Sequence, residues 1–135
     1  MLAVLRTAVI PFEPMRATMA DLICGAVPQR CPKIRLVNVE GGILRVASLL
    51  GFVDHWQHGH HPWTGPTLEE LPSDDFKRKL WALFGDDAAG IVTYELVGVD
   101  RLMLGSDHLY IEGTFAASRR KLCGTLWVCR RTRYI

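Results

Sequence analysis

The stretch Asp100-Arg-Leu-Met-Leu-Gly-Ser-Asp107 decides the fold class of this sequence. It has the length and apolar content of a short buried strand, and it ends in a carboxylate. Successive side chains of a strand face opposite sides, so Asp107 lies on the same side as Gly105 and opposite Leu104. Because Gly105 has no side chain, we expect open space beside the Asp107 carboxylate.

A helix is predicted directly before this strand, over residues 86–98. Asp86 or Asp87 can cap its N-terminus, and Gly98 can end it. A helix followed by a strand is half of an α/β unit, in which parallel strands alternate with helices. The two segments together therefore place the chain in the α/β class.

The same alternation runs through the rest of the chain. Strands are expected at residues 33–40 and 79–84, although the pattern of the second also allows a helix. Helices are expected at 14–27 and 43–56, from about 116 onward, and as a short turn after Ser73. Residues 55–72, which are rich in His, Pro, Gly and Thr, are expected to form a long loop. The resulting order, strand-helix-strand-helix-strand, is that of a parallel sheet.

The size and charge of the chain limit what it can be. Its 135 residues suffice for one domain with a core, whereas a closed (β/α)₈ barrel needs roughly 250. From position 119 onward the chain has six of its 16 Lys and Arg residues and none of its 14 acids. The first 118 residues are therefore mildly acidic, and they do not indicate a nucleic-acid surface.

The cysteines and the N-terminal residues indicate the cellular compartment in which we expect the protein. The four cysteines form no C-x-x-C pair, and we interpret them as free thiols in a reducing cytoplasm. Residues 1–11 are apolar, but Arg6 interrupts them and Pro11 ends them, which is not the pattern of a signal peptide. No run approaches the roughly 20 apolar residues of a membrane span. We therefore expect a cytoplasmic protein with no membrane partner.

Three blocks of the sequence resemble, in order, the amidohydrolase-related family, whose members are metal-dependent TIM barrels similar to aminocarboxymuconate-semialdehyde decarboxylase. The blocks are ADLICGAVPQRCPKIRLVNVEGG (20–42), LPSDDFKRKLWALF (71–84) and FGDDAAGIVTYELVGVDRLMLGSD (84–107). The resemblance implies a partial TIM (β/α) barrel, the C-terminal half with parallel strands and outer helices, within residues 1–118. Residues 119–135 do not follow the family and are expected to be a divergent basic tail.

The resemblance also implies roles for two carboxylates at strand ends. It assigns Asp107 to ligate a divalent metal, commonly zinc, or to take a proton from the attacking water. It places Glu40 where a carboxylate orients the substrate or acts in proton transfer. Read without the resemblance, Asp107 could cap a turn or pair with an arginine. Glu40 could likewise bond the backbone of the Gly41-Gly42 turn or pair with an arginine.

Two departures from the family pattern matter. His58-Gly59-His60 copies the family's H-x-H form, but it lies after Glu40 instead of near the N-terminus, and we interpret it as part of a solvated loop. Leu109-Tyr110 stands where the family has Pro-His.

The function that the resemblance implies is a metal-dependent hydrolase of small carboxylated or ring substrates. A non-oxidative decarboxylase is the alternative enzyme, and a non-catalytic remnant or interaction module is the alternative outside the enzymes. We expect no turnover by the chain alone, and self-association through an uncovered barrel face.

Overall fold

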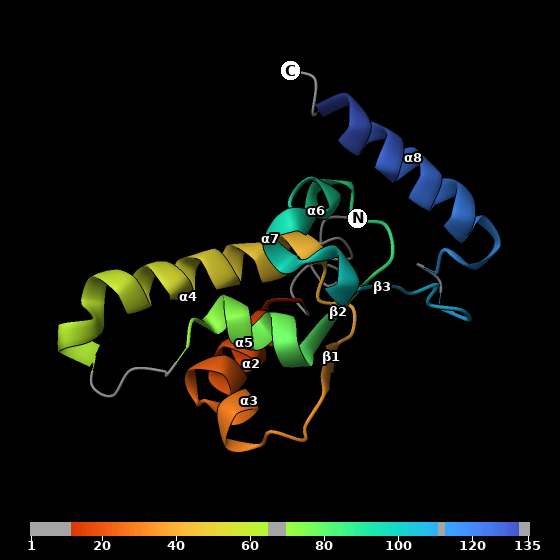
Figure 1. The fold of residues 1–135 in the computed structure, drawn as a ribbon. Helices are drawn as coiled ribbons and strands as arrows, with labels where there is room; N and C mark the ends of the chain where they lie inside the picture. The colour runs from red at the N-terminus through yellow and green to blue at the C-terminus, as the bar shows by residue number, and fades with distance from the viewer. Residues whose placement is uncertain (1–11, 65–69, 111–112, 133–135) are drawn as a thin grey trace, which may run out of the picture.

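The computed structural model of the chain describes residues 12–64, 70–110 and 113–132, which form a small sheet with helices around it (Figure 1). The elements, in chain order, are α2 (Phe12–Cys24), α3 (Val27–Arg30), β1 (Leu36–Asn38), α4 (Ile43–Thr64), α5 (Pro72–Lys79), β2 (Leu80–Phe84), α6 (Ala88–Val92), α7 (Tyr94–Val97), the 3₁₀ turn η1 (Val99–Arg101), β3 (Leu102–Leu104), the 3₁₀ turn η2 (Phe115–Ala117) and α8 (Ser118–Thr132).

The three strands form one parallel sheet in the order β1-β2-β3. Val37 of β1 lies opposite Trp81 of β2, and Leu83 of β2 lies opposite Met103 of β3. Each connection between neighbouring strands contains helices, as a parallel pairing requires. The predicted α/β class, with parallel strands joined through helices, is confirmed.

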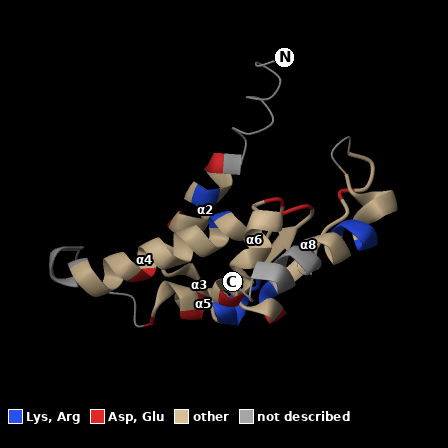
Figure 2. Cartoon of the chain, turned by 90° about the horizontal axis from the view of Figure 1, so that it is seen from above, with Lys and Arg blue, Asp and Glu red and all other residues tan. Residues whose placement is uncertain are grey.

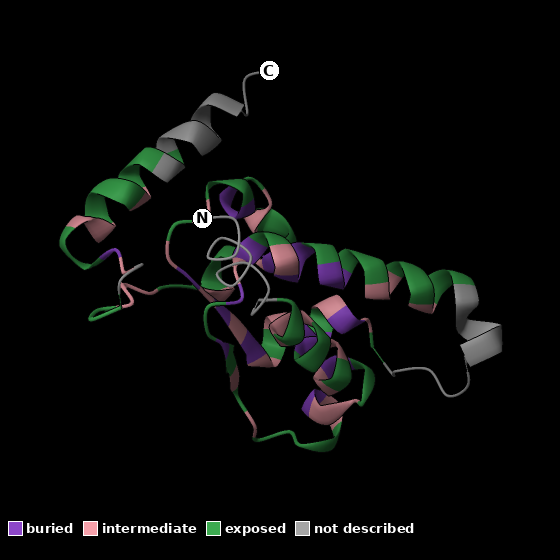
Figure 3. Ribbon diagram, turned by 180° about the vertical axis from the view of Figure 1, so that it is seen from behind, coloured by how far each residue is buried: buried purple, intermediate pink, exposed green. Residues whose placement is uncertain are grey.

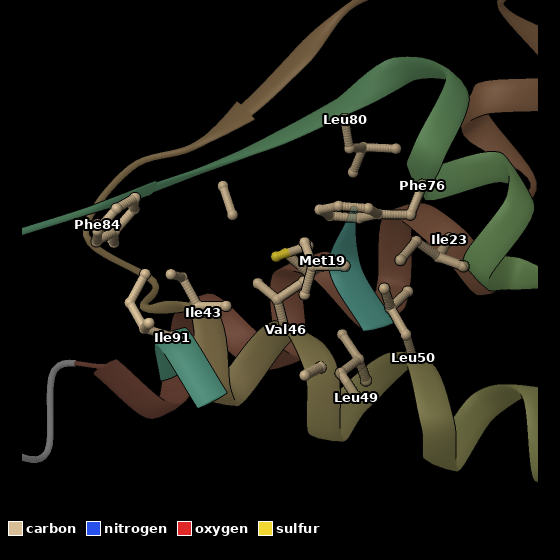
Figure 4. Close-up of a cluster of buried hydrophobic side chains, with 13 residues drawn as sticks. Met19, Ile23, Ile43, Val46, Leu49, Leu50, Phe76, Leu80, Phe84 and Ile91 are labelled. Carbon is tan, nitrogen blue, oxygen red and sulfur yellow. The ribbon is translucent and has the colours of Figure 1, made fainter. Parts of the chain in front are cut away.

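The core lies between one face of the sheet and the helices (Figure 4). Burial alternates along β2: Leu80, Ala82 and Phe84 are buried against the helices, whereas the residues between them are only half-buried. The buried hydrophobic side chains are Met19, Ile23, Ile43, Val46, Ala47, Leu49, Leu50, Phe76, Leu80, Ala82, Phe84, Ile91 and Val97. Full burial of a side chain such as Phe76 contributes roughly 2–3 kcal/mol. This layer therefore holds the loops at the strand ends in place.

Helix α4 supplies the largest share of that core. Ile43, Val46, Ala47 and Leu50 recur at helical spacing and are all buried, whereas Val53, the next apolar residue along the same stripe, is half-buried. Helix α2 adds Met19 and Ile23 from the other side (Figure 4). The apolar stripes of these helices therefore pack against the face of the sheet that carries Leu80, Ala82 and Phe84.

The predicted loop over residues 55–72 is wrong in its first half, because α4 continues to Thr64. His and Trp are adequate helix formers, and a helix tolerates one interior glycine at a cost of about 1 kcal/mol, as at Gly59. The rings of Phe52 and Trp56, one turn apart, also lie against each other at a tilt of 52°, with centroids 6.1 Å apart. The histidine-rich composition was therefore a poor indicator of a loop, and the stretch with His58 lies on a helix.

Element ends differ from the predictions for local reasons. Helix α5 begins at Pro72 with Leu71 as its N-cap and no side-chain cap. Ser73 is not the cap, because its backbone N–H donates to Asp54 Oδ1 at 3.0 Å. Proline suits the first helical turn, where its missing N–H is not needed. The outer strands β1 and β3 have three residues each, shorter than predicted, because each pairs with β2 along one side only.

Two further findings concern the whole described part. No described helix combines the length and the apolar character that crossing a bilayer requires. Cys24, Cys31 and Cys123 are free thiols, in agreement with the prediction from the sequence.

Candidate functional site

The C-terminal ends of the three strands meet at one edge of the sheet, because all three run in parallel. Glu40 follows β1, Asp86 and Asp87 follow β2, and Asp107 follows β3. Glu40 and Asp107 therefore lie beyond the same edge, as we expected from the sequence. Since β2 lies between them, the strands β1 and β3 that lead to the two carboxylates are about 10 Å apart.

Asp107 is half-buried in a turn held by its own backbone. Its carbonyl oxygen accepts the N–H of Tyr110 at 3.0 Å, and the N–H of Thr114 donates to Ser106 at 2.7 Å. Its φ is 46°, which is in the left-handed region. Asp and Asn occupy this region more readily than other residues with a side chain, and the surrounding backbone bonds fix the turn from which the carboxylate extends.

The open space beside the Asp107 carboxylate comes from Gly85, not from Gly105. A Cβ at Gly105 would lie 2.4 Å from Leu83 Cδ2, so that position is filled by Leu83 and our expectation was wrong. A Cβ at Gly85, directly after β2, would lie 3.8 Å from Asp107 Oδ2. The sequence alone could not show this, because Gly85 and Asp107 meet only once β2 and β3 have paired.

Glu40 occupies a second left-handed position at this edge, with a φ of 60°. Its side chain is exposed. Within the described part of the chain, its carboxylate bonds neither the Gly41-Gly42 turn nor an arginine, the two structural roles that the sequence had left open. Left-handed residues other than glycine gather here, since Leu109 also has a φ of 79°. Such clusters are typical of functional sites.

Asp87 is the residue whose importance sequence reasoning missed. We expected Asp86 or Asp87 to cap the following helix, and Asp87 does so: Oδ1 accepts the N–H of Gly90 at 2.7 Å. Its Oδ2 also accepts the N–H groups of Ile43 at 2.6 Å and Leu44 at 3.3 Å, at the start of α4. The signal in the sequence that could have pointed to this role was the pair Asp86-Asp87, which follows the buried strand β2 after a single glycine.

Asp86 faces the C-terminal helix instead. Its carboxylate forms an ion pair with Lys121 of α8 at 3.0 Å. Figure 2 shows the Lys and Arg residues at the start of α8, where the basic tail begins. Beside Asp107, the ring of His108 packs on Phe115 with centroids 4.0 Å apart. The carboxylates of Asp86 and Asp87 are thus used in structural contacts, which leaves Asp107 and Glu40 for chemistry.

The donor set does not fit a complete zinc site. Such a site takes three or four nitrogen, sulfur or oxygen ligands. Across residues 12–64, 70–110 and 113–132, no three His, Cys, Asp or Glu side chains gather closely enough to share an ion. His58 is exposed on α4, apart from the strand ends. The side chain of His60 lies outside the described residues. Asp107 therefore provides a single carboxylate ligand, where a zinc site needs three or four ligands.

Comparison with known proteins identifies the class of fold. No family model matches the chain, and no curated protein matches it. Among solved structures, the chain is similar to an amidohydrolase from Mycobacterium avium subsp. paratuberculosis K-10, with a TM-score of 0.64 and 25% identity. The similarity covers 82% of this chain and 27% of that one. The chain therefore has an amidohydrolase-like fold and spans about a quarter of the length of the solved enzyme, which supports a hydrolase-family relationship.

Proposed function

We propose that this chain forms the Asp107-bearing part of a hydrolase active site of the amidohydrolase-related kind. The observation that carries the proposal is the position of Asp107. It lies at the C-terminal edge of a parallel sheet, in a fold similar to an amidohydrolase, which is the edge where barrel enzymes place catalytic groups. The residue is half-buried, has a left-handed backbone, and its carboxylate is bonded to no other described residue.

The chemistry that these residues support is proton transfer. A carboxylate that accepts a proton from water must lie within about 2.6–3.2 Å of it. A Cβ at Gly85 would make only ordinary van der Waals contacts, 3.8 Å from Asp107 Oδ2 and 3.9 Å from Thr114 Cγ2, so this glycine leaves space of about the size of a methyl group beside the carboxylate. Glu40, exposed at the same edge, is the second carboxylate, and we assign it to orient the substrate. The substrate expected is a small carboxylated or ring-containing molecule.

A complete site of this kind is expected to hold a divalent metal, commonly zinc. Asp107 is the residue of this chain that we assign as its ligand, but one carboxylate holds zinc weakly. We further propose a cytoplasmic location, because Cys24, Cys31 and Cys123 are free.

A second candidate is a non-catalytic remnant or interaction module. The observation that favours it is the missing ligand cluster in the described residues. On this reading the fold and the edge carboxylates remain, but the isolated chain binds little metal and turns over no substrate.

One experiment separates the two candidates. Zinc content after dialysis would be measured together with hydrolysis of simple esters and amides and with release of CO₂ from carboxylated aromatics. The variant is Asp107→Asn, since asparagine tolerates the left-handed backbone. Asp100→Asn, an exposed aspartate at the opposite end of β3, is its control. A loss of about 100-fold in Asp107→Asn alone supports the hydrolase. CO₂ release would indicate the decarboxylase, and a folded chain without turnover the remnant.

A further inference from the structure

A small hollow lies where α2, the end of β1 and the start of α4 meet. It is lined by two arginines, one amide, one glycine and apolar side chains, among them Arg16, Met19, Asn38, Gly41, Arg45 and Val46. Figure 4 shows Met19 of α2 beside Val46 of α4, and Figure 3 shows that α4 is buried along one side and exposed along the other. The hollow thus has an apolar floor that belongs to the core and a polar rim.

The Asn38 side chain lacks a hydrogen-bond donor in this hollow. Asn38 is 7% exposed, and its Oδ1 is buried and accepts no hydrogen bond from any described residue. The amide lies over Gly41, where a Cβ would lie 2.6 Å from Oδ1, so the glycine provides the place that the amide occupies. No space for a water molecule remains among the lining side chains. A buried acceptor without a donor is costly, so a ligand that brings a donor to Asn38 gains that energy on binding.

The two arginines at the rim provide positive charge. Arg16 is half-buried, and its guanidinium forms no hydrogen bond or ion pair with the residues that the structure describes. Arg45, also half-buried, reaches across Gly42 toward Asp87: a Cβ at Gly42 would lie 3.4 Å from Arg45 Nη1 and 3.2 Å from Asp87 Oδ2. Guanidinium groups bind oxyanions through several N–H donors in a fixed arrangement. Arg16 therefore has its donors available for an anionic ligand, and Arg45 adds to the positive potential.

We propose that this hollow binds a hydrogen phosphate group, as the free ion or as a monoester. Arg16 and Arg45 donate to its unprotonated oxygens, and its P–O–H group donates to Asn38 Oδ1. A carboxylate or a sulfate near neutral pH satisfies the arginines but has no proton for Asn38. The long, flexible side chains of Arg16 and Arg45 close the hollow, and they must swing outward to admit the ligand and then close on it.

The test is isothermal titration calorimetry of the full chain with inorganic phosphate, phenyl phosphate and sulfate. At about pH 6 both phosphates retain a proton, whereas sulfate has none. At least one of the two phosphates is expected to bind with a dissociation constant below about 1 mM, at least tenfold more tightly than sulfate. Binding of phenyl phosphate identifies the site as one for monoesters, and binding of inorganic phosphate alone identifies it as one for the free ion.

Two variants and one control assign the residues. Arg16→Gln is expected to weaken phosphate binding at least tenfold, and circular dichroism would verify its fold. Asn38→Leu keeps the size of the side chain but removes the acceptor, so it is expected to bind phosphate and sulfate equally. Should Asn38→Leu fail to fold, Arg16→Gln still decides the question. Arg35→Gln changes an exposed arginine directly before β1, at the end opposite Asn38, and is expected to bind like wild type.

Four results would overturn the proposal. They are a wild-type chain that binds neither phosphate, equal affinities for phosphate and sulfate, unchanged binding by Arg16→Gln, and an equal loss in Arg35→Gln. A folded Asn38→Leu variant that still prefers phosphate would remove the role of the amide and overturn it as well. The readout is the heat of binding, not turnover, so this site stands or fails separately from the proposed hydrolase function of Asp107.

Discussion

The carboxylate of Asp87 accepts a hydrogen bond from the backbone N–H of Ile43 at 2.6 Å, and this contact joins the end of β2 to the start of α4. The N-terminus of a helix carries unsatisfied N–H groups and a partial positive charge, so a carboxylate is favourable there. The same side chain caps α6 through Gly90. Asp87 therefore fixes two of the loops that surround the candidate site.

The first prediction is that Asp87→Ala destabilises the chain more than an ordinary cap mutation. Loss of one N-cap costs about 1 kcal/mol, and here two helices lose theirs, so we expect the free energy of unfolding to fall by roughly 2–3 kcal/mol. Urea unfolding followed by circular dichroism measures this.

The neighbouring residue provides the control. Asp86→Ala removes only an exposed ion pair with Lys121, which is expected to change the free energy of unfolding by less than about 1 kcal/mol. Equal losses in the two variants would show that Asp87 does not act as a double cap.

The second prediction concerns Asp75, which is fully buried in α5. Its carboxylate accepts Gln29 Nε2 at 2.6 Å and also bonds the guanidinium of Arg78, so it links α3 to α5. The hydrogen bonds that the Arg78 guanidinium donates to Asp75 and Glu70 raise the pKa of Arg78, so this cation stays charged throughout the usable pH range. We expect Asp75→Ala to lower the free energy of unfolding by about 2 kcal/mol, because Gln29 loses its acceptor.

Asp74→Ala is the matched change one residue earlier, at an exposed position, and we expect little effect from it. Differential scanning calorimetry of both variants would test the comparison. If Asp74→Ala lowered the melting temperature as much as Asp75→Ala, the buried link would not be the cause.

The sequence predicted those features of the fold that depend on residues close together in the chain. Apolar spacing located the first turns of α4, whereas it left the segment that forms β2 open between a strand and a helix; Gly98 ends α7, as expected for the helical segment before β3. The composition of residues 55–64 was misleading, because a polar, histidine-rich stretch can continue a helix that is already anchored by its first turns.

The candidate site was less predictable, because its geometry depends on contacts between distant segments. Strand-end positions placed Glu40 and Asp107 at one edge of a parallel sheet, as the structure does. The room beside Asp107 depends on Gly85, however, and the second role of Asp87 depends on α4; both contacts form only when the strands pair. Periodicity describes one element at a time and carries no information on which loops meet.

The third prediction uses two glycines with opposite surroundings. Gly51 lies inside α4, and a Cβ there would meet nothing within 4 Å. Gly51→Ala is therefore expected to raise the free energy of unfolding by up to about 1 kcal/mol, because alanine has the higher helix propensity.

Gly41 is buried, and a Cβ there would lie 1.9 Å from Asn38 Nδ2. Gly41→Ala is expected to destabilise the chain, since the amide of Asn38 must move.

Urea titrations of the two alanine variants beside wild type would measure both effects. The expected midpoints lie on opposite sides of the wild-type value. A Gly41→Ala variant as stable as wild type would mean that the turn after β1 adjusts freely, which would also weaken the case for Glu40 as a positioned residue.

The fourth prediction is a pH dependence at Cys24. Partial burial raises the pKa of the Cys24 thiol, and the negative charge of Asp21 one turn earlier adds to the effect. Because the thiolate is the reactive form, a raised pKa leaves less of it at a given pH. We therefore expect iodoacetamide to label Cys24 more slowly than Cys31 near neutral pH, and the difference to shrink as the pH rises above the pKa of Cys24.

Peptide mass spectrometry after timed labelling, repeated between about pH 7 and pH 10, follows each thiol separately. Asp21→Asn removes the neighbouring charge, which lowers the pKa of Cys24 and is expected to speed its labelling while leaving Cys31 and Cys123 unchanged. Burial, the larger cause, remains in that variant, so Cys24 should still react more slowly than Cys31. Equal rates for Cys24 and Cys31 in the wild-type chain across the whole pH range would contradict the prediction, because they would mean that the surroundings of Cys24 do not raise the pKa of its thiol.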